Sequence, residues 1–223
     1  MTKMLKAPVI YEAGFLKDAD AMFAVLWNDL PWIRHDKVPR KECYFNEFNS
    51  PYSYGTPEFA RVYEPTPVWH PLVKDIQVQL EAFLEEKLGF KMRMEVCFLN
   101  GYADGKDQLG WHADDSPEMD DARPIITISL GAAREIWFRL NEIEAAKLFL
   151  SATGSVWDKD TATTDQKTIY LAIREREVLL LGNGSIAIML PGMQDTHEHR
   201  IPRSGMNKCG PRISLTFRGY AAV

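Results

Sequence analysis

A short histidine–carboxylate motif in the middle of the chain could bind a metal ion. His112 and Asp114 are separated by one residue, and side chains two residues apart on an extended chain point to the same side. A distant histidine would complete the two-histidine, one-carboxylate face that is typical of non-haem Fe(II) oxygenases. His197 and His199 both lie downstream with the same parity, so strand periodicity leaves either of them open as the third ligand. Taken alone the triplet is a weak signal, because a surface or hydrogen-bonded pair gives the same pattern.

A second candidate site is the alternating segment near the C-terminus. Arg212, Ser214, Thr216 and Arg218 fall on one face of a strand, and apolar residues occupy the other face. Alternation by itself is typical of a sheet with one solvated face. The polar face also suits an anion pocket, because a guanidinium group binds a carboxylate through a planar, two-pronged contact. A dicarboxylic cosubstrate beside an iron ion needs such a group.

Asn100 and Tyr102 form a third pair of polar residues, directly after a strongly alternating strand. Two residues apart on an extended chain, their polar ends can enter one pocket. The alternative interpretation is a turn that carries a surface tyrosine.

The elements around these motifs are mostly strands. Predicted strands cover residues 92–98, 125–130, 135–140, 169–173, 178–181, 185–190 and 213–217. The Gly182-Asn183-Gly184 sequence between two of them is a hairpin signal. Many strands with few helices between them favour a mostly β fold, a sandwich or barrel with flanking helices, over a doubly wound sheet.

Helices and loops account for the rest. Residues 71–88 predict a helix, because leucine or isoleucine recurs at every fourth position. Shorter helices are expected at residues 18–26 and 141–150, and a polar surface loop at 151–168. Residues 31–67 carry many prolines and aromatic residues, which indicates an irregular arm with short strands.

Composition limits the class of protein. The 223 residues include 26 basic and 31 acidic side chains, a net charge of −5, which argues against a protein that coats nucleic acid by bulk charge. The three cysteines are isolated, so we expect a reducing compartment, the cytoplasm or, in a eukaryote, the nucleus. No stretch reaches the roughly 18 apolar residues of a membrane helix, and we expect a monomer without a membrane partner.

The order of these motifs resembles the AlkB family of Fe(II)- and 2-oxoglutarate-dependent dioxygenases. The similar segments are LNGYADGKDQLGWHADD, PIITISLGAAREIWFR, HRIP and PRISLTFR. Two segments of the arm, PRKECYF and SPYSYG, resemble the branch that repairs alkylated DNA. The resemblance implies a double-stranded β-helix (jelly-roll) core at residues 91–223. It implies that residues 1–90 form helices and a nucleotide-recognition arm packed on that core.

The resemblance also implies roles for single residues. His112, Asp114 and His199 would bind the iron, and His199 is preferred over His197 because Arg200-Ile201-Pro202 follows it. The cosubstrate contacts would come from Asn100, Tyr102, Arg212, Ser214 and Arg218. Among these, Arg212 would pair with the distal carboxylate of 2-oxoglutarate, and Ser214 stands where the family often has asparagine.

Substrate contacts are implied in two places. Tyr52 and Tyr54 fall where the family places aromatic residues against a flipped base, and Arg200 and Arg203 would bind phosphates. Basic residues of the arm, among them Arg40, are further phosphate candidates. Residues 140–169 exceed the family minimum, and a surface loop is the favoured interpretation over a lid or a partner surface.

The implied activity is oxidative demethylation of N-alkylated bases in DNA, with RNA left open. It would use Fe(II), 2-oxoglutarate and dioxygen and release formaldehyde, succinate and carbon dioxide. The acidic net charge motivates an alternative, a 2-oxoglutarate oxygenase that hydroxylates a protein or a small molecule. A non-enzymatic barrel with a bound metal is a third hypothesis.

Overall fold

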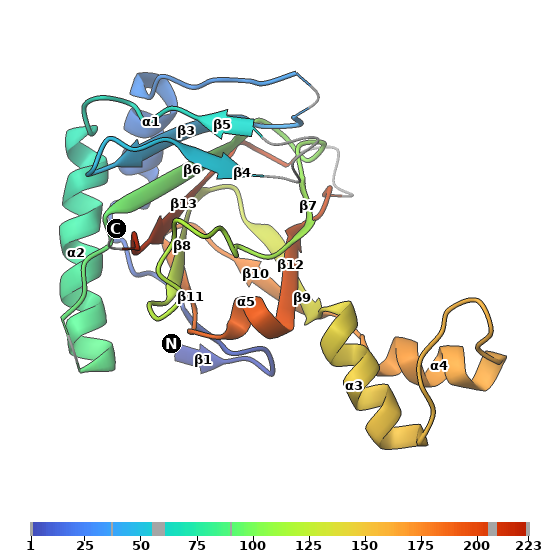
Figure 1. Cartoon of the computed structure of the whole chain (residues 1–223). Helices are drawn as coiled ribbons and strands as arrows, with labels where there is room; N and C mark the ends of the chain where they lie inside the picture. The colour runs from blue at the N-terminus through green and yellow to red at the C-terminus, as the bar shows by residue number, and fades with distance from the viewer. Residues whose placement is uncertain (1, 37, 55–60, 90, 205–208, 222–223) are drawn as a thin grey trace.

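Two antiparallel sheets lie face to face in the centre of the molecule, with two long helices outside one of them (Figure 1). The computed structural model describes residues 2–36, 38–54, 61–89, 91–204 and 209–221. The seven-stranded sheet has the order β1 (Thr2–Met4), β2 (Val9–Glu12), β11 (Ser185–Met189), β8 (Ile125–Gly131), β13 (Arg212–Arg218), β6 (Val96–Tyr102) and β3 (Lys41–Asn46). The four-stranded sheet has the order β10 (Glu177–Leu181), β9 (Arg134–Leu140), β12 (His197–Ile201) and β7 (Leu109–His112). The short strands β4 (Tyr52–Tyr54) and β5 (Arg61–Tyr63) pair only with each other.

Strand periodicity separates two cores. In β13 the apolar residues Ile213, Leu215 and Phe217 pack against the helices, together with the corresponding residues of β6, β8 and β11. The opposite faces of the sheets meet in the second core, where Ala187 of β11 contacts the cluster that contains Phe138 of β9. The polar face of β13 therefore points between the sheets and not into solvent. This arrangement confirms the predicted mostly β, jelly-roll type core.

Two long helices cover the outer side of the seven-stranded sheet, and two others project beyond the end of the four-stranded sheet (Figure 1). The helices are α1 (Ala19–Asp29), α2 (Pro71–Leu88), α3 (Glu142–Thr153), α4 (Thr164–Ile173) and the short α5 (Met193–Thr196). The predicted helix at 71–88 is confirmed at both ends. Pro71 occupies the first turn, the His70 ring accepts a hydrogen bond from the Leu72 amide, and Gly89 ends the helix with a φ of 79°.

Three sequence predictions are wrong. The surface loop expected at residues 151–168 is shorter, because α3 runs to Thr153 and α4 begins at Thr164. Residues 169–173 form the second half of α4 and not a strand, because Thr163 and Gln166 make a capping box that starts a helix just before them. The glycine turn at 182–184 does not close a hairpin. Strand β10 before it belongs to the four-stranded sheet and β11 after it to the seven-stranded sheet, so the turn carries the chain from one sheet to the other.

Other boundaries differ from the predictions in smaller ways. The strand predicted at 92–98 is β6, which starts at Val96; Met94 is fully buried although its backbone lies outside the strand. Strands β1, β2 and β3 come from the first ninety residues but belong to the same sheet as β13. The division of the chain at residue 90 stays a prediction. Among the described residues no helix is long and apolar enough to cross a membrane.

Candidate metal centre and active-site pocket

Three side chains from two neighbouring strands converge on one point between the sheets. His112 ends β7, Asp114 follows it, and His199 stands directly opposite His112 on β12. The Nε2 atom of His112 lies 3.7 Å from Asp114 Oδ1, and that of His199 lies 3.6 Å from Asp114 Oδ2. One ligand atom from each residue lies within 4.8 Å of the others. Such a face of two imidazoles and one carboxylate fits a divalent iron with open coordination positions.

The electrostatics of the triad suit a metal ion. Burial alone would raise the pKa of Asp114, but the Arg218 guanidinium and the two histidines lower it to about 2. Burial, with His112 and Arg218 nearby, lowers the pKa of His199 to about 3. At neutral pH the set is therefore a carboxylate with a neutral imidazole, which is the protonation state that metal binding requires. The carbonyl oxygen of Gly110 lies 2.9 Å from His112 Nδ1 and orients that ring with Nε2 toward the centre.

His197 does not join the triad. Its ring lies two residues before His199 along β12, and its Nδ1 atom lies 2.8 Å from Thr196 Oγ1. It lines a separate groove with residues of β9 and β10. Periodicity left the two histidines equivalent, and the pairing of β12 with β7 brings His199 to the site.

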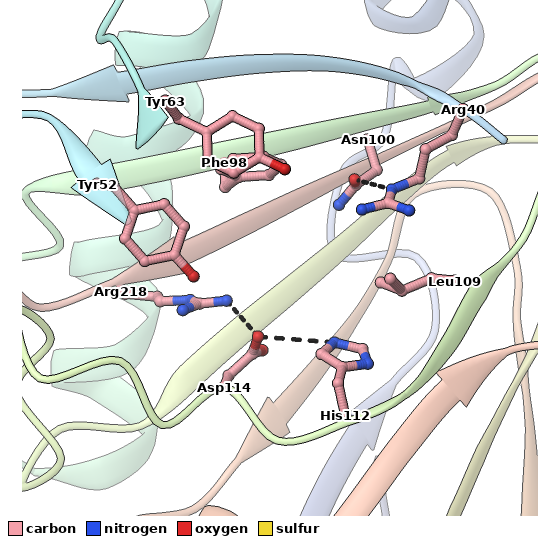
Figure 2. A pocket seen from close by; sticks show the side chains of 9 residues that line it. All are labelled: Arg40, Tyr52, Tyr63, Phe98, Asn100, Leu109, His112, Asp114 and Arg218. Atoms are coloured by element: carbon pink, nitrogen blue, oxygen red, sulfur yellow. Dashed lines mark hydrogen bonds and ion pairs between the residues drawn. The ribbon is translucent and has the colours of Figure 1, made fainter. Parts of the chain in front are cut away.

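Arg218 and Arg212 mark two ends of the polar face of β13. Arg218 is buried and donates to Asp114 Oδ1, while its Nε and Nη1 atoms have no hydrogen-bond partner. Its guanidinium therefore lies beside Asp114 of the metal triad, as Figure 2 shows.

Arg212 is a fully buried cation with an open donor. Its Nε donates to Ser129 Oγ at 2.8 Å and its Nη2 to Ser214 Oγ at 3.4 Å, whereas Nη1 is buried without a partner. Burial lowers its pKa to about 10, so it stays charged at neutral pH. A buried charge needs a counter-ion or full hydrogen bonding. No carboxylate of the described residues pairs with it, so a ligand carboxylate, as in 2-oxoglutarate, fits this position.

The remaining predicted cosubstrate residues line the same cavity. Asn100, Tyr102 and Ser214 are buried and border the cavity that contains His112 and His199. The Oδ1 atom of Asn100 accepts a hydrogen bond of 2.6 Å from Arg40 Nε. The structure thus commits one of the two polar ends of Asn100 to the protein itself.

Above the triad, aromatic side chains form one wall of the pocket (Figure 2). The rings of Tyr52 and Tyr63 are stacked with centroids 5.9 Å apart, and Phe98 meets Tyr63 edge-on at 5.0 Å. Tyr52 accepts a hydrogen bond from Ser116. The side chain of Tyr54, predicted to contact a base with Tyr52, lies outside the described residues.

Sequence reasoning missed part of this wall. Arg40, expected on a phosphate surface, is buried in the pocket, where it donates to Asn100 and, at 2.6 Å, to Glu42 Oε1. Tyr63 was not singled out at all. The signal that the sequence offers is parity, because Arg40 and Glu42 alternate with the apolar Cys43 and therefore share a face. The pairing of β3 with β6 decides what that face meets.

Arg200 and Arg203 do not enter the pocket. Arg200 follows His199 on β12, so its side chain lies on the outer face of the four-stranded sheet, 5.6 Å from the centroid of the Trp111 ring. Arg203 is exposed beyond the end of β12. Their predicted contact with phosphates stays a prediction.

Comparisons with known proteins agree with this geometry. A family model described as the 2OG-Fe(II) oxygenase superfamily matches residues 15–218. The alpha-ketoglutarate-dependent dioxygenase alkB homolog 3 of Bos taurus is 30% identical over 211 residues, which cover 91% of this chain and 62% of that protein. The human homolog 3 is 28% identical over 92% of this chain and 63% of its own length. The DNA oxidative demethylase ALKBH2 of Mus musculus is 25% identical over 81% of this chain and 62% of its own length.

The chain therefore spans less than two thirds of these curated relatives. Among solved structures, that of OsALKBH1 superposes with a TM-score of 0.57 and covers 99% of this chain and 100% of that one. Its 15% sequence identity makes this a similarity of fold.

Proposed function

This chain belongs to the 2OG-Fe(II) oxygenase superfamily and, within it, to the AlkB family, and we propose that it removes alkyl groups from N-alkylated nucleobases in DNA or RNA. The enzyme class, an Fe(II)- and 2-oxoglutarate-dependent dioxygenase, agrees with the sequence prediction. The single observation that supports the substrate class is the pocket, in which an aromatic wall and a buried arginine stand directly over the metal triad.

His112, Asp114 and His199 would hold the iron. With 2-oxoglutarate and dioxygen bound, the iron supplies the oxidising chemistry that hydroxylates the N-alkyl carbon, so that formaldehyde, succinate and carbon dioxide are released. The contribution of the protein is to hold and orient the reactants. Arg218 donates a hydrogen bond to Asp114 Oδ1, the oxygen that His112 also approaches, and so helps to hold the carboxylate in place.

Arg212 would bind the distal carboxylate of 2-oxoglutarate through its free Nη1 edge. Ser129 and Ser214 hold the other edge of the guanidinium and fix its plane. Because all three side chains are buried, water does not compete for the carboxylate, and a charge-assisted hydrogen bond is stronger there than in solvent.

The aromatic wall would receive the target base. A base must leave the stack to reach an enclosed site, at a cost of a few kcal/mol, and a lesion that blocks pairing lowers that cost. Tyr52, Tyr63 and Phe98 offer ring surfaces against which a flipped base can stack. Arg40 offers guanidinium donors at the far end of the pocket, where the edge of such a base would lie.

The test is incubation of the iron-loaded protein with single- and double-stranded oligonucleotides, each carrying one N-methylated base, followed by mass spectrometry. We expect loss of the methyl group with equimolar formaldehyde and succinate, and none when 2-oxoglutarate is omitted. If succinate forms without loss of methyl from any DNA or RNA, the substrate class is wrong. The protein or small-molecule alternative would then take its place.

A further inference from the structure

The outer face of the four-stranded sheet carries tryptophan and arginine side chains that lie in cation–π contact with one another. Trp111 of β7 and Trp137 of β9 have ring centroids 6.5 Å apart. Arg200 of β12 lies between them, with its Cζ 5.6 Å from the first ring centroid and 5.3 Å from the second. Arg139 lies 3.9 Å from the Trp111 centroid and Arg176 lies 4.2 Å from that of Trp137. We name these five residues the Trp–Arg ladder.

The strand register explains the ladder. Arg200 is the direct partner of Trp137 across β12 and β9. His199, the residue before Arg200, is the partner of His112, the residue after Trp111. Since successive side chains on a strand alternate between faces, the two metal-binding histidines point inward and the ladder residues next to them point outward. The ladder therefore lies one sheet thickness from the metal triad.

Two cations of the ladder lack a counter-ion. Arg139 is paired with Glu198, which also binds Arg174 outside the ladder. Among the described residues, no carboxylate oxygen lies within ion-pair distance of Arg176 or Arg200, and the Nε of Arg200 is buried without any acceptor. A guanidinium group in a cation–π contact presents its face to the ring, so the N–H donors in its plane, apart from the buried Nε of Arg200, remain available to a phosphate.

The loop that follows Asp114 carries several carboxylates and repels phosphate. Asp121 lies near other carboxylates on the loop that follows Asp114. Partial burial, with Asp195, Asp115 and Asp120 nearby, raises its pKa above the usual range. Negative charge therefore gathers after Asp114, whereas the two arginines without a counter-ion lie on the outer face of the sheet whose edge strand is β7.

We propose that the Trp–Arg ladder binds the single-stranded nucleic acid that flanks the target base, with phosphates on Arg176 and Arg200 and bases on the tryptophan rings. The proposal rests on the proposed function. Stacking on aromatic or guanidinium planes combined with backbone neutralisation is how proteins bind single strands without reading sequence. It would also reconcile nucleic-acid binding with a net charge of −5, because only a local ladder is required.

The first experiment measures fluorescence anisotropy of labelled, unmethylated 16-nucleotide DNA and RNA strands, and of the duplex, with the metal-free full chain. We expect both single strands to bind more tightly than the duplex. The double variant Arg176→Gln/Arg200→Gln should weaken single-strand binding about tenfold at low salt. It should also reduce the slope of log K against log salt by about 1.4, because each phosphate contact to a single strand contributes about 0.7.

The matched control removes the same charge elsewhere. Lys91 and Lys167 are exposed and lie outside the ladder, so Lys91→Gln/Lys167→Gln should shift affinity less than twofold. Equal losses in the two double variants would show only a bulk-charge effect and overturn the proposal. Wild-type protein that binds no single strand at low salt would overturn it as well.

Cross-linking gives a readout that no folding defect can imitate. A single-stranded oligonucleotide with photoreactive 5-iodouracil next to the methylated base should cross-link to Trp111 or Trp137 of the wild-type chain. Cross-links confined to other surfaces would contradict the proposal.

Demethylation assays separate the two proposals. Loss of the ladder should lower kcat/KM for a methylated 16-mer about tenfold and for a methylated trinucleotide less than twofold. If both substrates are demethylated and the ladder variants change neither, the ladder proposal fails and the proposed function stands. If no methylated substrate reacts while the ladder still governs binding, the proposed function fails instead.

Discussion

The metal end and the substrate end of the pocket are attached to the two main sheets in different ways. His112 and His199 are direct partners across β7 and β12 of the four-stranded sheet, and Arg212 stands on β13 inside the seven-stranded sheet. Arg40 and Tyr63 come from the start of edge strand β3 and from β5, a strand of the separate two-stranded sheet. The direct pairing of β7 with β12 fixes the separation of the two histidines, which suits ligands that must meet one ion. Strands β4 and β5 pair only with each other, so Tyr52 and Tyr63 can be replaced without a change in the pairing of the metal-binding strands.

The two ends also differ in charge balance. At the metal end, Asp114 is balanced by Arg218, while Arg212 is left for a ligand. At the substrate end, the charge of Arg40 is already balanced by Glu42 within the protein. We therefore expect losses at the metal end to have larger effects than losses at the substrate end.

The largest effect should come from the metal end. His199→Ala should weaken iron binding by more than about 100-fold, beyond what changes in supporting residues cause, and abolish turnover. His197→Ala, two residues away on the same strand, is the matched control and should bind iron nearly as the wild type does. Titration with Co(II), followed by visible absorption, measures the metal affinity of both variants. A larger loss of affinity in His197→Ala than in His199→Ala would reassign the distal ligand.

Arg212 tests the cosubstrate part of the same end. Arg212→Ala should raise the KM for 2-oxoglutarate about 100-fold, because a hydrogen bond to a charged group contributes about 1.5–3 kcal/mol and 1.4 kcal/mol is tenfold. Co(II) affinity should change little, which separates this role from metal binding. An unchanged KM for 2-oxoglutarate would remove Arg212 from the role.

A change at the substrate end should be smaller and confined to the nucleic acid. Arg40→Gln, combined with Glu42→Gln so that no buried carboxylate is left unpaired, should lower kcat/KM for a methylated oligonucleotide about tenfold, or 1.4 kcal/mol. Succinate formation without substrate should persist. The control is Lys41→Gln, since Lys41 lies over the Trp27 ring outside the pocket. A matching rise in the KM for 2-oxoglutarate would show that the two ends are not separable.

The smallest effect is a pH dependence of the metal-free protein. The pKa of His199 is lowered from 6.5 to about 3 by burial and by His112, so the unfolded chain takes up the proton first as the pH falls. Stability should therefore decrease from pH 6.5 toward 3, and the ionised Asp114, with its pKa of about 2, adds a further loss below about 3.8.

Between pH 6.5 and 5.5 the protonation of His199 in the unfolded chain lowers the free energy of unfolding by about 1 kcal/mol. This corresponds to a decrease of about 2–4 °C in Tm. Differential scanning fluorimetry in a chelator measures it, and His199→Asn should give a flatter profile than the wild type. A variant profile as steep as that of the wild type would assign the pH dependence to other groups.

Much of the fold followed from short-range patterns. The fourfold spacing and the terminal Pro71 and Gly89 were enough to define α2, because helix ends depend on local backbone chemistry. The alternation in 212–218 predicted β13 for the same reason. In contrast, residues 169–173 have the composition of a strand but follow a capping box, and that local signal decides in favour of a helix.

The site was predictable where one segment carried the signal and not where distant segments had to meet. His112 and Asp114 share a segment, and their proximity could be deduced from strand geometry. The position of Arg40 could not, because it depends on β3 pairing with β6 so that Glu42 faces Asn100. The pairing continues across the sheet, where Asn100 of β6 is the partner of Ser214 of β13, and Ser214 is the partner of Ser129 of β8.

The sequence by itself determined which residues alternate, which helix starts and ends where, and which family the motifs resemble, since these depend on neighbours along the chain. Only the tertiary structure decided that the polar face of β13 is buried, that His199 and not His197 meets His112, and that Trp111 and Arg200 share an outer face. The physical reason is that strand pairing sets the register between distant segments, and a shift of one residue would move every side chain to the other face.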